Sequence, residues 1–170
     1  MKKWFYAITF SVTGFLGCKK NEGCKSTAPI TIASASESAY LQNYLTANSI
    51  TASQKNGMYY VISNQGTGTS PNLCSSITTD YVGNLMNATS DGAQFDFSKP
   101  NQPLITTLNN LIAGWQIIFP LIKAGGTATL YIPPSLGYGA SPSGGTLPNG
   151  QPAIPANSYL KFVVTLKAVN

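Results

Sequence analysis

Few residues in this sequence could take part in chemistry. Its 170 residues include no histidine, which excludes Ser-His-Asp and Cys-His hydrolases and most zinc enzymes. Two settings stand out: Asp96 lies between Phe95 and Phe97, and Tyr138 lies between two glycines. A carboxylate between aromatic side chains is rarely buried without a hydrogen-bonding reason. Taken by itself, Tyr138 is an ordinary loop aromatic, whereas Asp96 requires a hydrogen-bonding partner.

Short elements must position these residues. Runs of β-branched and aromatic residues, bounded by glycine and proline turns, predict strands over 58–63, 76–82, 93–97, 127–132 and 159–169. Ile118, Phe119 and Ile122 recur at helical spacing after the Gly114-Trp115 pair and predict one short helix. We therefore expect an α+β domain over residues 51–170, with a curled antiparallel sheet wrapped over that helix.

A second helix is predicted before this domain. Ser34 and Glu37 match a capping box, and an apolar face follows, formed by Tyr40, Leu41, Tyr44 and Leu45. Asn48 is a plausible C-terminal stop. This short N-terminal helix either packs on its own domain, which we rank first, or binds a partner or a second copy.

Composition excludes a nucleic-acid function. Only 9% of the residues are charged, the chain has no arginine, and its lysines are scattered, so the clustered cations that phosphates require are missing. Frequent glycine (16) and proline (11) indicate a β-rich extracytoplasmic domain.

The N-terminus has the pattern of a bacterial export signal. Lys2 and Lys3 precede an apolar run over 4–15, too short to span a membrane permanently, and then Leu16-Gly17-Cys18. This arrangement resembles the bacterial lipoprotein signal. It implies a signal peptide over 1–17, lipidation of Cys18, and a lipidated tether with the short helix over 18–50. The alternatives are an ordinary signal peptide or a buried Cys18.

Two further cysteines form an even pair. A bridge between Cys24 and Cys74 would close a loop of about 50 residues and suit an oxidising compartment. Two free thiols are an equally acceptable interpretation.

Six short motifs occur in a characteristic order. They are Leu111-Ile112, Gly114-Trp115, Lys123-Ala124-Gly125-Gly126, Ile132-Pro133-Pro134, Tyr138-Gly139 and Ile154-Pro155-Ala156-Asn157. In this order and spacing they resemble the FKBP-type peptidyl-prolyl isomerases. Asp80-Tyr81-Val82-Gly83 and Phe95-Asp96 fit the same family.

The resemblance implies a site and an activity. Tyr81, Asp96 and Tyr138 would be catalytic, and the substrate pocket would be formed by Phe95, Leu104, Leu111, Ile112, Trp115, Ile154 and Phe162. The implied substrates are proline-containing unfolded or secreted polypeptides, and no cofactor or metal is needed. The implied place of action is the bacterial cell envelope, facing the periplasm or the cell surface. The alternatives are a non-catalytic lipoprotein or chaperone that binds proline segments, and a structural lipoprotein without a site.

Three departures from the family pattern bear on the site. Leu104 stands where relatives usually carry an aromatic residue, and Lys99 is the only base close after Phe97. Residues 140–153 form a longer segment rich in glycine, proline and serine, which we expect to make a flap beside Tyr138.

Overall fold

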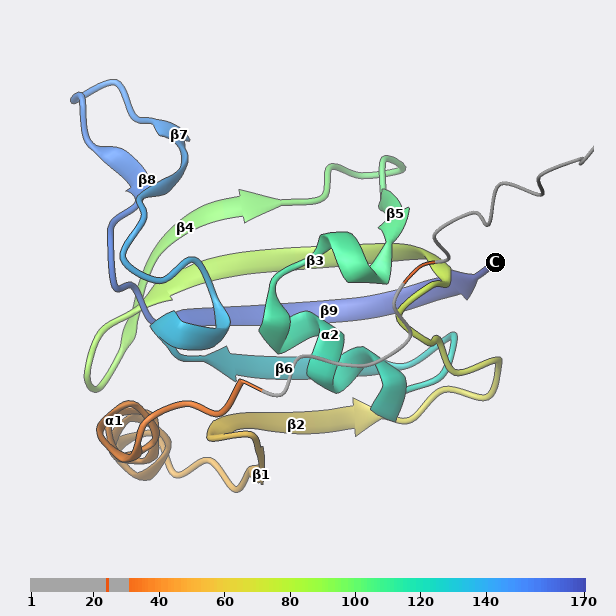
Figure 1. The fold of residues 1–170 in the computed structure, drawn as a ribbon, viewed down its shortest axis with the longest axis horizontal. Helices are drawn as coiled ribbons and strands as arrows, with labels where there is room; N and C mark the ends of the chain where they lie inside the picture. The colour runs from red at the N-terminus through yellow and green to blue at the C-terminus, as the bar shows by residue number, and fades with distance from the viewer. Residues whose placement is uncertain (1–23, 25–30) are drawn as a thin grey trace, which may run out of the picture.

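An antiparallel sheet organises the molecule (Figure 1). The computed structural model describes Cys24 and residues 31–170. The strands run in the order β1-β2-β6-β9-β3-β4, β5 pairs with β3, and β7 and β8 form a separate hairpin. Their bounds are β1 Ser53–Lys55, β2 Met58–Asn64, β3 Ser76–Met86, β4 Asp91–Phe97, β5 Leu104–Thr107, β6 Thr127–Ile132, β7 Ser143–Thr146, β8 Pro152–Ile154 and β9 Leu160–Val169.

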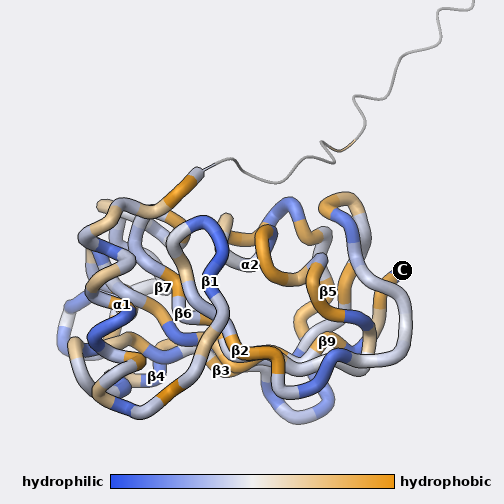
Figure 2. The backbone as a smooth tube through the Cα atoms, turned by 90° about the horizontal axis from the view of Figure 1, so that it is seen from below, coloured by the Kyte–Doolittle hydropathy of each residue, from blue (hydrophilic) through white to orange (hydrophobic). Residues whose placement is uncertain are grey.

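Helices are short and lie on both faces of this sheet. They are α1 Ala35–Ala47 and α2 Ala113–Ile118, with 3₁₀ turns η1 Leu108–Asn110, η2 Phe119–Leu121 and η3 Pro134–Leu136. Alternate residues of β6 separate the two faces: Leu130 and Ile132 belong to the core cluster that includes Trp115 of α2, whereas Tyr131 packs with α1. Helix α2 therefore fills the inner face, and α1 covers part of the outer face. Figure 2 shows apolar, orange stretches of the chain beside the α2 label.

Most of the predicted elements are present, with changed ends. The strand over 127–132 is found as predicted, but β3 continues past Gly83 to Met86 because it pairs with β9 as far as Leu85↔Leu160. The helix predicted after Gly114-Trp115 is α-helical only to Ile118. Pro120 then lacks the N–H that a further α-turn needs, and the chain continues as a 3₁₀ turn.

Helix α1 begins and ends as its sequence predicts. The Ser34 side chain accepts from the Glu37 N–H, the Glu37 carboxylate accepts from the Ser34 N–H, and Asn48 is the C-cap. Leu41, Tyr44 and Leu45 are buried against the sheet of the same chain. This packing corresponds to the first of the two interpretations of the helix.

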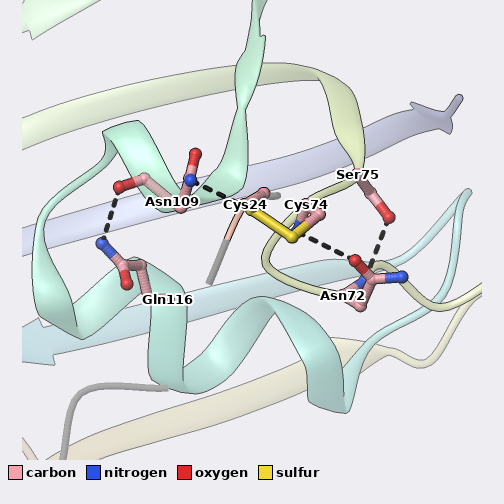
Figure 3. The surroundings of a disulfide bond; sticks show 6 residues. All are labelled: Cys24, Asn72, Cys74, Ser75, Asn109 and Gln116. Carbon is pink, nitrogen blue, oxygen red and sulfur yellow. Dashed lines mark hydrogen bonds between the residues drawn. A yellow bond between two sulfur atoms is a disulfide. The ribbon is translucent and has the colours of Figure 1, made fainter. Parts of the chain in front are cut away.

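Cys24 and Cys74 form a disulfide with Cα atoms 5.5 Å apart (Figure 3). Asn72 holds the loop that carries Cys74: its N–H donates to Ser75 Oγ (3.1 Å), and its Oδ1 accepts from the Cys74 N–H (2.8 Å). Of the two alternatives that the sequence left open, the structure contains the bridge. It attaches a residue that precedes α1 to the loop that leads into β3.

Cys18 and the predicted signal over 1–17 lie outside the described residues. Within the described part, no helix has both the length and the apolar character needed to cross a membrane.

Helix α1 is tied to the sheet by a carboxylate at the start of β4. Tyr44 donates to Asp91 Oδ1 (2.5 Å), and Lys161 of β9 pairs with Asp91 Oδ2 (2.7 Å). Burial alone would raise the pKa of Asp91, but the hydrogen bonds from Lys161 and Tyr44 outweigh it and lower that pKa below its ordinary 3.8.

Acid should therefore weaken the attachment of α1. Because the folded-state pKa of Asp91 is depressed, its contribution is present above the unfolded value and lost as the pH falls through the folded-state pKa, below about pH 4. We expect Asp91→Asn to reduce the free energy of unfolding by about 1 kcal/mol at pH 7, and by progressively less below pH 4, in urea titrations.

Asp80→Asn is the matched control. Asp80 and Lys167 form an ion pair at 2.8 Å, but their side chains are 39% and 53% exposed. The loss of this pair should therefore change the unfolding free energy little at pH 7 or at pH 3. A difference between wild type and Asp91→Asn that stays constant from pH 7 to pH 3 would contradict the assignment.

Candidate active site

A cavity of about 240 Å³ opens between the inner face of the sheet and helix α2. Its floor is apolar and buried, with Trp115 and Phe162 each only 3% exposed. Its rim carries exposed polar side chains, among them Tyr138, which is 37% exposed. The lining residues are Tyr81, Phe95, Asp96, Leu104, Asn110, Leu111, Ile112, Trp115, Tyr138 and Phe162.

Nine of the ten predicted catalytic and pocket residues line this one cavity. The exception is Ile154, at the end of β8, which is 2% exposed and belongs to the core cluster without lining the pocket. Asn110 lines the pocket and was missed, because the Asn109-Asn110 pair reads as a polar turn. Its position immediately before the Leu111-Ile112 pair was the only signal that could have identified it.

The aromatic side chains hold one another edge to face. Trp115 of α2 contacts Phe162 of β9 at 5.2 Å and Tyr81 of β3 at 5.6 Å between ring centroids, and Phe95 of β4 contacts Phe162 at 5.5 Å. Behind the pocket, Phe119 stacks on Trp115 at 4.9 Å. Such pairs add about 0.5–1.5 kcal/mol each beyond area burial, so the walls are held rigidly.

Gly83 makes room for this packing. It lies on β3 opposite Phe162 of β9, and a Cβ at this position would approach Phe162 and Phe95 to 2.7 Å. A side chain at position 83 would therefore push both rings from their places in the pocket wall.

Gly83→Ala should disturb the pocket. We expect a loss of about 1–3 kcal/mol in unfolding free energy from overpacking, and a several-fold loss in kcat/KM for exchange of a proline peptide. Gly92→Ala is the matched control, since its Cβ would meet only Leu85, at 3.2 Å, outside the pocket. An unchanged kcat/KM in Gly83→Ala would show that the two rings do not form the working wall.

Asp96 and Tyr81 form the polar pair of the site. The Tyr81 hydroxyl donates to Asp96 Oδ2 (2.6 Å), and the backbone N–H of Phe97 donates to Asp96 Oδ1 (2.8 Å). Burial, together with the hydrogen bond to Asp96 and its charge, raises the pKa of Tyr81 far above the ordinary value of 10.0. Tyr81 therefore stays protonated and keeps the carboxylate oriented toward the pocket rim.

Tyr138 remains a phenol under all ordinary conditions. Burial raises its pKa above 10.0, and the nearby charge of Asp96 adds to the effect. A neutral phenol at the rim of an apolar cavity can donate a hydrogen bond to a carbonyl group that enters the pocket.

Two features of α2 complete the site. Gln116 donates from Nε2 to the carbonyl oxygens of Leu111 (2.6 Å) and Asn109 (3.1 Å), so it fixes the turn that carries Asn110. Trp115 Nε1 is buried without a hydrogen-bond partner among the described residues. Native structures rarely keep such a group without a reason, and this one belongs to a side chain of the pocket floor.

Fold and site together define a class: an antiparallel sheet wrapped over a short helix, with one aromatic pocket between them. Residues 68–167 match the family described as FKBP-type peptidyl-prolyl cis-trans isomerase. The chain belongs to this family, which confirms the predicted α+β fold.

Individual relatives agree with this assignment. The peptidyl-prolyl cis-trans isomerase Mip of Coxiella burnetii is 37% identical over 130 residues, covering 74% of this chain and 52% of the relative. The outer membrane protein MIP of Legionella longbeachae is 33% identical over 92 residues, which cover 54% of this chain and 38% of the relative. A peptidyl-prolyl cis-trans isomerase structure from Pseudomonas syringae pv. tomato covers 82% of this chain and 98% of its own, at 25% identity and a TM-score of 0.63. The chain thus spans about half or less of these two curated relatives.

Proposed function

We propose that this protein is a peptidyl-prolyl cis-trans isomerase that acts on extracytoplasmic polypeptides. The observation that carries the proposal is the single cavity lined by Tyr81, Asp96, Trp115, Tyr138 and Phe162. At about 240 Å³ it is smaller than the roughly 300–1,000 Å³ of sites for drug-sized ligands, which suits one prolyl ring.

Rotation about an X-Pro bond requires no covalent chemistry. The barrier of ~18–20 kcal/mol arises from amide resonance, and lowering it by ~7 kcal/mol would accelerate exchange roughly 10⁵-fold. The planar amide is strongly dipolar, whereas the half-rotated amide has an amine-like nitrogen and a smaller dipole. An apolar, water-poor pocket disfavours the planar state more, which is differential binding of the transition state.

The residues of the pocket would divide this work. Trp115 would form the floor under the prolyl ring, with Phe95, Phe162 and the aliphatic side chains as walls. Tyr138 would donate to the substrate carbonyl. Asp96, with Tyr81 as its fixed donor at 2.6 Å, would orient the rotated carbonyl. Leu104 takes part in the wall as an aliphatic residue, so it need not be aromatic for the pocket to close.

The proposed place of action is the bacterial cell envelope. Lys2-Lys3, the apolar run and Leu16-Gly17-Cys18 support export and lipidation of Cys18, and two or more acyl chains would hold the protein stably on a bilayer. The Cys24–Cys74 bridge fits an oxidising compartment, and one relative carries the name outer membrane protein. Mass spectrometry of the protein purified from bacterial membranes tests this, because an unmodified Cys18 would contradict it.

The test of activity measures rate and affinity separately. Exchange between the cis and trans forms of a short Ala-Pro peptide is followed by NMR with the full chain present, and the dissociation constant is obtained from the same titration. Acceleration by substoichiometric protein supports the isomerase. Saturable binding without acceleration would instead support the alternative, a lipoprotein that only captures proline-containing segments.

A further inference from the structure

Glu37 connects helix α1 to the turn that precedes Tyr138. Its Oε1 accepts from the Ser135 N–H (2.9 Å) and its Oε2 from the Ser135 hydroxyl (3.0 Å), across 98 positions of sequence. The same Oε2 accepts from the N–H and the hydroxyl of Ser34, both at 2.9 Å. Glu37 thus completes the capping box of its own helix and also accepts two hydrogen bonds from Ser135 of η3.

The sequence of η3 explains why its turn needs an external acceptor. The first N–H groups of a helical turn have no partner within the turn. Pro133 and Pro134 have no N–H, so Ser135 supplies the first donor, and η3 has no side-chain cap of its own. The carboxylate of Glu37 takes the place of that cap.

The turn next to Ser135 encloses Tyr138. The Pro134 carbonyl accepts from the N–H of Gly137 (3.0 Å) and of Gly139 (2.9 Å), which closes the backbone around the tyrosine. Gly139 in turn accepts from the Asn157 N–H (2.8 Å). A displacement of Ser135 therefore moves the backbone that carries the phenol.

Helix α1 also contacts the far end of this segment. One turn after Glu37, Tyr40 stacks on Tyr159 with ring centroids 3.9 Å apart. Residues 136–158, which include Tyr138 and the β7–β8 hairpin, thus lie between two attachments to α1. No residue of α1 lines the pocket, yet the contacts of α1 lie on both sides of the segment that carries Tyr138 at the rim.

We propose that Glu37 is a positioning residue of the isomerase site: through Ser135 it sets the Tyr138 phenol over the pocket, which makes α1 a working part of the enzyme. This inference rests on the proposed function for its kinetic consequence. We expect the effect of Glu37 on the reaction to pass through Tyr138, because Ser135 belongs to the turn that leads into this residue.

Glu37→Ala should lower kcat/KM for peptide exchange by roughly 3- to 10-fold in the full chain. In a Tyr138→Phe background the same substitution should change kcat/KM by less than about 1.5-fold, because the hydroxyl that it misplaces is already absent. The midpoint of urea unfolding should fall equally in both backgrounds. This separates a positioning role from a merely structural one.

Two variants serve as controls. Ser34→Ala removes the capping partner but leaves both bonds to Ser135, so it should lower the unfolding midpoint and leave kcat/KM unchanged. Glu37→Gln keeps an acceptor for the Ser135 N–H and should retain most of the activity.

Three outcomes would overturn the proposal. They are an unchanged kcat/KM in Glu37→Ala, an equal loss in both backgrounds, and a loss in Ser34→Ala as large as in Glu37→Ala. If the wild-type chain shows no exchange activity, the proposed function fails, and NMR of ring-labelled tyrosines decides the positioning. With the Tyr138 signal assigned from Tyr138→Phe, a shift in Glu37→Ala supports the contact and an unmoved signal rejects it.

Discussion

Replacing Asp96 by asparagine will lower kcat/KM for proline-peptide exchange by roughly 10- to 100-fold. The carboxylate accepts from the Tyr81 hydroxyl at 2.6 Å and from the Phe97 N–H at 2.8 Å, and it lies at the exposed rim. A 10- to 100-fold loss corresponds to about 1.4–2.7 kcal/mol of transition-state stabilisation, because each 1.36 kcal/mol is a tenfold change in rate. Asparagine keeps the shape and removes the charge, so the free energy of unfolding should change by less than about 1 kcal/mol.

Tyr81→Phe is the companion measurement. It keeps the aromatic wall against Trp115 and removes only the donor that holds Asp96. We expect a smaller loss, of a few-fold, because the Phe97 N–H still orients the carboxylate. Full activity in Asp96→Asn would show that the charge of Asp96 plays no part in the reaction.

Removing the disulfide will have the largest effect on stability. The bridge joins residues 50 apart and closes a loop that contains α1, β1 and β2. The chain-entropy model then attributes about 4 kcal/mol to it, which corresponds to roughly 10–15 °C in Tm for a chain of this length. Calorimetry of the Cys24→Ala, Cys74→Ala double variant should show this loss, and wild type in reductant should match the variant.

Two controls separate the bridge from other effects of cysteine. Cys18→Ala should leave Tm unchanged, since the structure pairs Cys24 with Cys74. Alkylation of the denatured wild-type chain without reductant should leave both of these cysteines unmodified. If both are modified and reductant does not change Tm, the bridge does not form in solution.

Local patterns determined most of the elements. The capping box at Ser34 and Glu37 starts α1, and the β-branched run over 127–132 forms β6 with the predicted ends. Capping and alternation depend on neighbours a few positions apart, so a single sequence contains them. The ordered motifs from Leu111 to Asn157 went further and indicated the family, and with it nine of the ten residues that line the pocket.

The tertiary structure decided what depends on distant partners. Strand β3 runs through Gly83 because β9 pairs with it, and Asn110 reaches the pocket because Gln116 fixes the preceding turn. Ile154, by contrast, belongs to the core cluster and does not line the pocket. The sequence does not predict the contact between Glu37 and Ser135, because a hydrogen bond between residues 98 positions apart produces no periodic pattern along the chain. Patterns with a short repeat can be read along the chain; contacts between separate elements exist only once the sheet has brought those elements together.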